Sequence, residues 1–157
     1  MTRPTETATA RPTEATRIVG RDGRAKAYRP LPEADRIAAI EAGLAAYDRG
    51  DFFLAHEDLE PAWMGSADLG ERAVLQGLIK LAAAYVHAVR RNPPGIQRNL
   101  VGARQRLTEP GAEAAAAALD GLDLTGLIHD IDRRLADLAS HSTDPRLGPP
   151  VLRRSVP

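Results

Sequence analysis

Apolar side chains recur every three or four residues through the middle of the chain. The pattern starts with Ile37, Ile40, Leu44 and Tyr47, and this spacing is typical of an amphipathic helix. By the same criterion the sequence predicts helices over residues 33–49, 52–64, 69–91, 93–107 and 125–138, with a short, weakly amphipathic helix in the Ala-rich stretch 112–119. Because short connections favour antiparallel neighbours, the predicted fold class is all-α, an antiparallel bundle of about four to five helices.

Residues that favour helix starts lie at the expected boundaries. Asp51, Asp68, Asn92 and Thr125 are the expected N-caps, since their short polar side chains can accept a hydrogen bond from the first free N–H groups. Pro61 falls inside the second predicted helix. It has no N–H to offer the carbonyl four residues back, so we expect a kink or a tightened last turn there.

Segments rich in Pro, Thr and Arg flank the helical part. The sequence predicts a disordered basic arm with an extended lead-in over residues 1–32, a helical domain over 33–139, and a disordered Pro/Arg tail over 140–157. The chain is neutral as a whole, but the two flanking segments are basic and the part between them is acidic. A basic arm can bind nucleic acid. Here the basic residues are spread out and lack interleaved aromatic residues, so nucleic acid is not an expected partner.

The composition excludes several classes of protein. The chain has no cysteine, which excludes disulfides, thiolate metal sites and cysteine nucleophiles and fits the cytoplasm, the location we expect. No apolar run approaches the ~20 residues of a membrane span, and no apolar signal segment is evident. Lys26 and Lys80 are the only lysines among many arginines, a bias typical of a GC-rich, bacterial-type genome.

The second predicted helix carries the most unusual set of side chains. At ~100° per residue, His56, Glu60 and Trp63 fall on one side of the helix together with Phe52, while Glu57 lies on the flank. A carboxylate beside aromatic side chains is costly unless it is paired or hydrogen-bonded. We therefore expect Glu60 to have a polar partner.

The third predicted helix offers such partners along a narrow polar stripe. The stripe consists of Gln76, Lys80, Ala83 and His87. If the second and third helices pack antiparallel, this stripe can face His56 and Glu60 and gather all the polar groups at one interface. Gly77, beside the stripe, has no side chain and is expected to let a neighbouring helix come close.

The order of these motifs resembles a known family. The pattern His-x3-Glu-x2-Trp is formed by His56, Glu60 and Trp63. Residues 75–79 (Leu-Gln-Gly-Leu-Ile) and His87 follow, and then an Asn-x-x-Gly turn at residues 92–95. Together with the preceding segments 23–25 and 29–32, these motifs resemble the domain-of-unknown-function family 309. The resemblance implies an all-helical fold and no established activity.

Four interpretations of the polar cluster stay open. His56, Glu60 and His87 could bind a divalent metal ion, with Glu57 or Gln76 nearby, because ligands four residues apart on a helix can share one ion. Glu60 could instead be the general base of a metal-free, hydrolase-type site. The cluster could also be a structural network that fixes how the two helices pack. Finally, the bundle could be an interaction module for a protein partner or a second copy of the chain. A network within such a module is the interpretation we place first.

Overall fold

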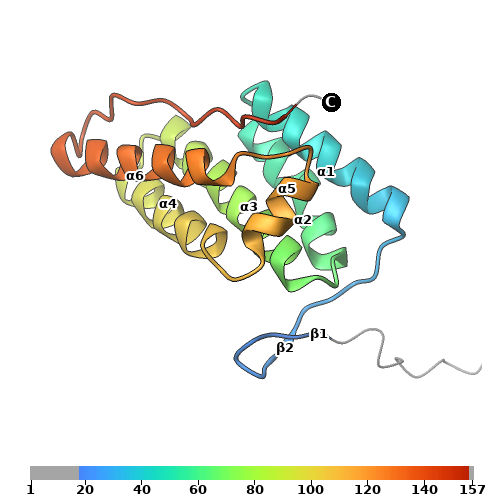
Figure 1. The fold of residues 1–157 in the computed structure, drawn as a ribbon. Helices are drawn as coiled ribbons and strands as arrows, with labels where there is room; N and C mark the ends of the chain where they lie inside the picture. Colours follow the sequence, from blue (N-terminus) through green and yellow to red (C-terminus); the bar gives the residue numbers. More distant parts are fainter. Residues whose placement is uncertain (1–17, 156–157) are drawn as a thin grey trace, which may run out of the picture.

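The computed structural model describes residues 18–155, and these form six helices and one small hairpin (Figure 1). The elements are β1 (Ile18–Val19), β2 (Ala25–Lys26), α1 (Glu33–Asp48), α2 (Phe52–Gly65), α3 (Leu69–Val89), α4 (Pro93–Leu107), α5 (Ala112–Ala118) and α6 (Leu124–Ser140). The all-α prediction is confirmed, with slightly more helices than expected. None of the helices in this part of the chain is both long and apolar enough to cross a membrane.

Side-chain caps fix where four of the helices begin. Asp51, Asp68 and Asn92 each accept a hydrogen bond from the backbone N–H three residues ahead, as the sequence predicts. The prediction for the last helix was wrong. Its cap is Asp123 rather than Thr125, because α6 begins at Leu124 and the Asp123 carboxylate reaches the N–H of the third residue beyond it at 2.9 Å.

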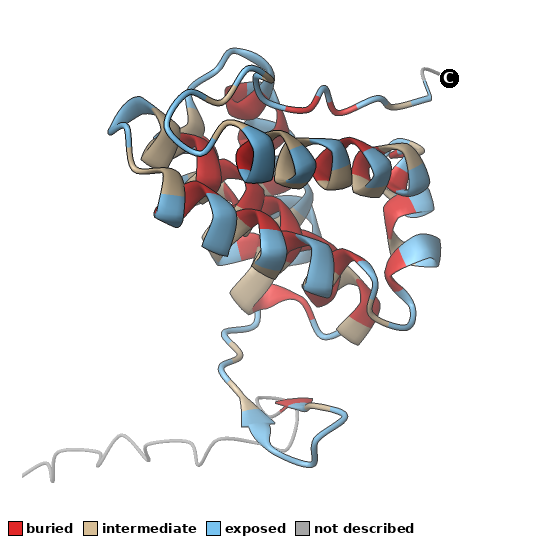
Figure 2. Cartoon of the chain, turned by 90° about the vertical axis from the view of Figure 1, so that its left-hand side faces the viewer, coloured by how far each residue is buried: buried red, intermediate tan, exposed pale blue. Residues whose placement is uncertain are grey.

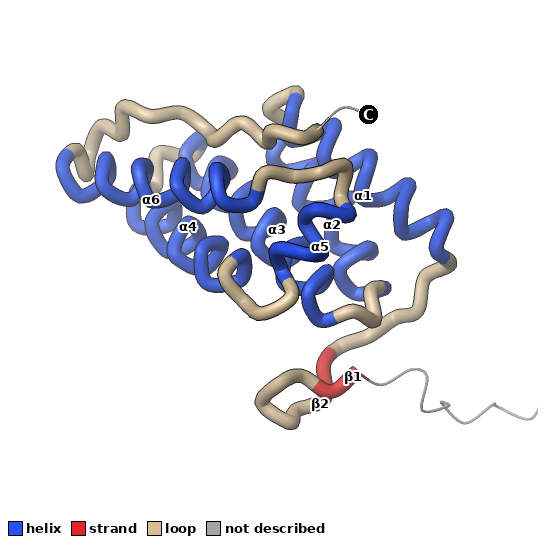
Figure 3. The backbone as a smooth tube through the Cα atoms, in the orientation of Figure 1, coloured by secondary structure: helices blue, strands red, loops and turns tan. Residues whose placement is uncertain are grey.

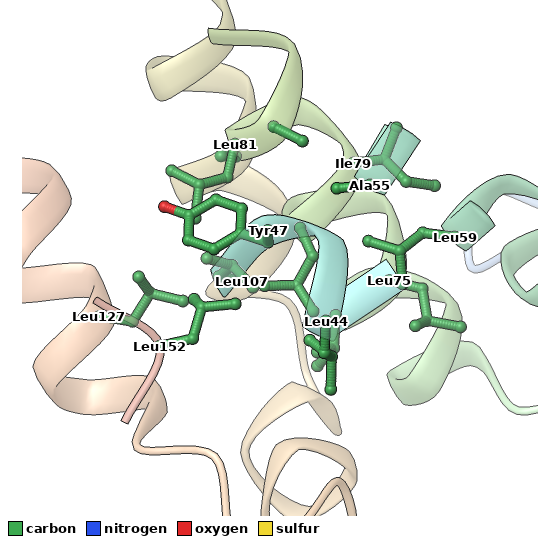
Figure 4. Packing of buried hydrophobic residues seen from close by; sticks show 14 of the residues in the cluster. Leu44, Tyr47, Ala55, Leu59, Leu75, Ile79, Leu81, Leu107, Leu127 and Leu152 are labelled. Atoms are coloured by element: carbon green, nitrogen blue, oxygen red, sulfur yellow. The ribbon is translucent and has the colours of Figure 1, made fainter. Parts of the chain in front are cut away.

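Successive helices pack side by side in chain order from α1 to α4, while α5 packs on α3 and α6 on α4. Their buried sides face one another and their exposed sides form the surface (Figure 2). The core between them is mostly Leu and Ala (Figure 4). Gly77 lies at the contact of α3 with α4, where a Cβ atom would come within 2.6 Å of the Leu107 side chain. The close approach expected at Gly77 is therefore confirmed.

A buried arginine joins three parts of the chain. The Arg72 guanidinium donates to the carbonyl oxygens of Trp63 (3.0 Å) and Ser66 (3.2 Å) at the end of α2, and to that of Ala27 (2.8 Å) in the segment that leads to α1. Arg72 is only 6% exposed, and burial lowers its pKa from the ordinary value. Its charge is stabilised by carbonyl dipoles in place of a carboxylate. Such polar partners are needed because burying an ion without them is costly.

The segment after α6 differs from the disordered tail expected for residues 140–157. It runs back over the helices without regular secondary structure (Figure 3). The Tyr47 hydroxyl donates to the Pro150 carbonyl at 2.7 Å, Leu152 is buried, and Arg154 pairs with Asp48 of α1. The Pro-rich composition concealed these anchors, because each is a single residue with no periodicity around it. Residues 156–157 lie outside the described part.

The expected basic arm over residues 1–32 is described only from Ile18 onward. There, β1 and β2 pair antiparallel, with Ile18 opposite Lys26. The hairpin is joined to the bundle by Arg21, whose guanidinium donates to the Pro110 carbonyl at 2.9 Å. Residues 1–17 lie outside the described part of the chain.

Replacing Arg72 should destabilise the protein substantially. Arg72→Met would remove the guanidinium donor from three carbonyl groups, and we expect the free energy of unfolding to fall by about 2–4 kcal/mol in urea denaturation. Arg104→Met is the matched control, since Arg104 pairs with Asp132 at the exposed surface and such pairs contribute little. Equal losses for the two variants would contradict this role of Arg72.

Asp137 should make the stability depend on pH. Its carboxylate accepts from the N–H groups of Leu147 (3.0 Å) and Arg146 (2.8 Å), and these bonds, with a smaller effect of His141, lower its pKa below 3.8. A carboxyl group whose pKa is lower in the folded state stabilises the fold above its unfolded pKa, and the effect disappears as the pH falls through the folded value.

Asp137→Asn should therefore be less stable than the wild type near neutral pH, and the difference should shrink below about pH 4. Urea denaturation over a pH series measures this difference, with Asp144→Asn at an exposed position as the control. If the difference in the free energy of unfolding stays constant down to pH 2, the negative charge of Asp137 does not contribute to the stability of the fold.

Candidate functional site

Helix α2 brings three potential ligand residues together on its surface. His56, Glu57 and Glu60 each offer one nitrogen or oxygen atom, and these three atoms lie within 4.8 Å of one another. The His56 Nδ1 atom is 3.7 Å from Glu57 Oε1, with the two side chains 35% and 54% exposed. Within residues 18–155 this is the only group of at least three His or acidic residues so arranged.

The packing of α2 explains why this group stays at the surface. The buried side of the helix is formed by Ala55, Leu59 and Ala62. Leu59 lies over Gly43 of α1, where a Cβ atom would come within 2.4 Å of the leucine Cγ atom. Because Gly43 has no side chain, Leu59 can approach α1 closely, and this side of α2 is buried. Its opposite side, with His56 and Glu60, is only partly buried.

Trp63 lies at the other end of the motif and contacts a different partner. The Arg72 guanidinium carbon is 5.4 Å from the centre of the Trp63 ring, which is the geometry of a cation–π contact. Ser66 N–H bonds to the Trp63 carbonyl three residues back at 3.4 Å, so the last turn after Pro61 is tightened, as expected. Trp63 is thus fixed by Arg72, a residue that the sequence analysis missed.

The polar stripe of α3 does not face α2 directly. Gln76, Lys80, Ala83 and His87 are all partly exposed. Leu75 and Ile79, on one side of the stripe, pack beside Leu59 and Ala55 of α2 (Figure 4). On the other side, Gly77 contacts α4. The stripe therefore runs between the two contact sides of α3.

Two members of the stripe, Lys80 and His87, contact α4 or its N-cap instead. The His87 Nδ1 atom lies 3.1 Å from the Asn92 side-chain nitrogen, and a Cβ atom on Gly95 would come within 2.6 Å of the His87 ring. Lys80 lies along Gly102 of α4, with its Cδ atom 3.0 Å from where a Cβ would be. His87 is consequently not part of the group formed by His56, Glu57 and Glu60.

Gln76 and Trp63 do share a site. Both line a pocket of about 310 Å³ between α2, α3, the end of α4 and the hairpin. Its other walls include Arg72 and Arg106, and the hairpin contributes Arg21, Asp22 and Lys26. The predicted site residues thus divide into the His56–Glu57–Glu60 cluster, the Trp63–Gln76 pocket, and the contacts of Lys80 and His87 with α4.

Residues 40–99 match the family model described as Domain of unknown function (DUF309). The match includes all of α2 and α3 and therefore every candidate residue of the sequence analysis, which confirms the resemblance. The preceding motif segments and residues 100–107 lie outside the match. No curated protein and no solved structure matches the chain.

The cluster on α2 offers one imidazole nitrogen and two carboxylate oxygens. Such a donor set can bind a divalent ion or accept hydrogen bonds from a partner. Neither His56 nor Glu60 lines the Trp63–Gln76 pocket or the two larger pockets of the described chain. A hydrolase-type site at Glu60 therefore has no enclosed substrate space beside it in these pockets.

Stability measurements should separate a functional cluster from a structural one. Because His56 and Glu60 are only partly buried, we expect His56→Ala and Glu60→Gln each to lower the free energy of unfolding by less than about 1 kcal/mol. Leu59→Ala on the buried side of the same helix is the control, with an expected loss of about 2–5 kcal/mol. Losses of several kcal/mol at His56 and Glu60 would favour the structural network.

Proposed function

We propose that this DUF309 domain binds a divalent transition-metal ion through His56, Glu57 and Glu60. The observation that supports the proposal is the gathering of three ligand atoms within 4.8 Å on one helix turn. An imidazole with two carboxylates suits zinc, cobalt or nickel better than magnesium or calcium, which bind oxygen ligands alone. Glu57 takes the place that the sequence analysis gave to His87.

The ligand side chains must move closer together when the ion binds. Bonds of about 2.0–2.1 Å to nitrogen and oxygen bring the ligand atoms around one zinc ion to roughly 3.4 Å from one another. His56 and Glu57 are exposed enough to rotate into this arrangement. Three protein ligands leave at least one coordination position open, and water or a substrate group can occupy it.

An interaction module is the second candidate function. The observation in its favour is Phe53, which is 62% exposed. It is the one aromatic residue among the exposed large apolar side chains of the described residues. Phe53 precedes His56 by three residues and therefore lies on the same side of α2. A second copy of the chain is the partner we consider, with Phe53 at the contact and the structural network beside it.

Metal binding should be measurable by titration of the full-length, tag-free protein with Zn²⁺ and Co²⁺. Isothermal calorimetry should give one site per chain, and Co²⁺ should produce visible absorption bands. His56→Ala and Glu60→Gln should each weaken binding at least tenfold, because each removes one of three ligands. Binding should also weaken in acid, where protons compete for the ligands.

The chain contains a matched control for this experiment. His141 follows Asp137 by four residues on α6, with 3.2 Å between His141 Nδ1 and Asp137 Oδ1, but Asp137 already accepts two backbone hydrogen bonds. His141→Ala should therefore leave metal binding unchanged. The proposal fails if the α2 variants bind as tightly as the wild type, or if the wild type shows no binding at millimolar metal.

A further inference from the structure

A separate cavity of about 690 Å³ lies at the ends of three helices. Its walls are the last turns of α3, the first turns of α4, the second half of α6, and residues 143–149 of the segment that follows α6. The volume is in the range of small-molecule sites. Because α6 and the C-terminal segment lie outside residues 40–99, much of this cavity is formed by parts of the chain beyond the DUF309 match.

Aromatic and aliphatic side chains form most of the inner wall. Phe52 and Tyr85 line the cavity together with Ile96, Leu100 and Leu138. The Phe52 ring lies 5.6 Å from Tyr85 and 5.2 Å from Tyr47 behind it. Three of the six aromatic residues of this aromatic-poor chain thus meet at one place, and they give the cavity a firm apolar floor.

Two arginines, Arg91 and Arg134, and two acids, Asp137 and Asp144, line the cavity. Arg134 lines the cavity and lies 3.8 Å from the Asp130 carboxylate. The same carboxylate also pairs with Arg153 at 3.1 Å and Arg133 at 3.8 Å. One negative charge therefore serves three guanidinium groups, and the charge of Arg134 is only partly compensated.

Of the two acids, Asp144 is exposed to solvent, and Asp137 already has hydrogen-bond donors of its own. Asp137 also lines the cavity, but its oxygens accept from the N–H groups of Arg146 and Leu147 and from His141. Tyr85 is a neutral hydroxyl donor at this wall, because burial raises its pKa to about 12 despite the opposing effect of Arg134. An anionic group would thus meet a cation and a hydroxyl donor.

We propose that this cavity binds a small amphipathic anion, an organic acid with an unbranched or aromatic apolar body. Its carboxylate lies at Arg134 and the Tyr85 hydroxyl, and its apolar part lies against Phe52 and Leu100. Residues 143–149 cover the ligand, held in place by the hydrogen bond from Arg134 Nε to the Gly148 carbonyl (2.7 Å). This site is independent of the metal cluster on α2.

Decanoate is a suitable probe, with decanol as its neutral counterpart. Calorimetric titration of the full-length protein should show saturable one-to-one binding of decanoate and at least tenfold weaker binding of decanol, because only decanoate gains the charge-assisted contact. Arg134→Gln should weaken decanoate binding at least tenfold and bring it close to that of decanol. Tyr85→Phe should weaken it a few-fold.

Filling the cavity tests its location. Ala88 lines the cavity, and Ala88→Phe should abolish binding, whereas Ala139→Phe at an exposed position of α6 outside the lining should not. A nitroxide-labelled fatty acid provides a test on the wild type, without dependence on any variant. It should broaden the methyl resonances of Ile96, Leu100 and Leu138 and leave that of Leu59 on α2 unchanged.

Three results would overturn the proposal. Equal affinity for decanoate and decanol would show that Arg134 does not recognise the anion. Unchanged binding to a folded Ala88→Phe protein, or broadening spread evenly over the methyl groups, would place the ligand elsewhere. No binding of decanoate at millimolar concentration would show that the cavity does not take this class of ligand.

Discussion

The Arg72 guanidinium is the contact that most directly holds the turn between α2 and α3 in this structure. It joins the end of α2 to the segment before α1 through three carbonyl oxygens, and it stacks on the Trp63 ring. A buried cation without a carboxylate partner is tolerated only when such dipoles surround it. The position of Trp63 therefore depends on one arginine of the next helix.

Periodicity and capping chemistry were enough to predict the helices but not what surrounds them. Asp51 and Asp68 mark true helix starts, because a cap acts within three residues of itself. A helical wheel shows that Gln76 and His87 share a side of α3, but not which neighbour that side meets. That choice depends on how closely α4 approaches at Gly77, and a contact between residues distant in sequence leaves no periodic signal.

Only part of the candidate site could be predicted, because only part of it depends on residues close together in the sequence. His56 and Glu60 are four residues apart on one helix, so their proximity is a local property. The addition of Glu57 and the separation of His87 depend on side-chain rotation and on the packing of α4, which the sequence does not encode locally. Arg134 and Tyr85 were missed altogether, because they come from two different helices and carry no motif.

The hydrogen bond from the Tyr47 hydroxyl to the Pro150 carbonyl joins residues 103 positions apart. During synthesis Tyr47 leaves the ribosome long before Pro150, so α1 to α4 can assemble while this hydroxyl still faces water. The cavity beneath residues 143–149 closes only after these residues, which follow all six helices of the described chain, have been synthesised. The helices matched by the family model can thus fold before the cavity between α3, α4 and α6 is complete.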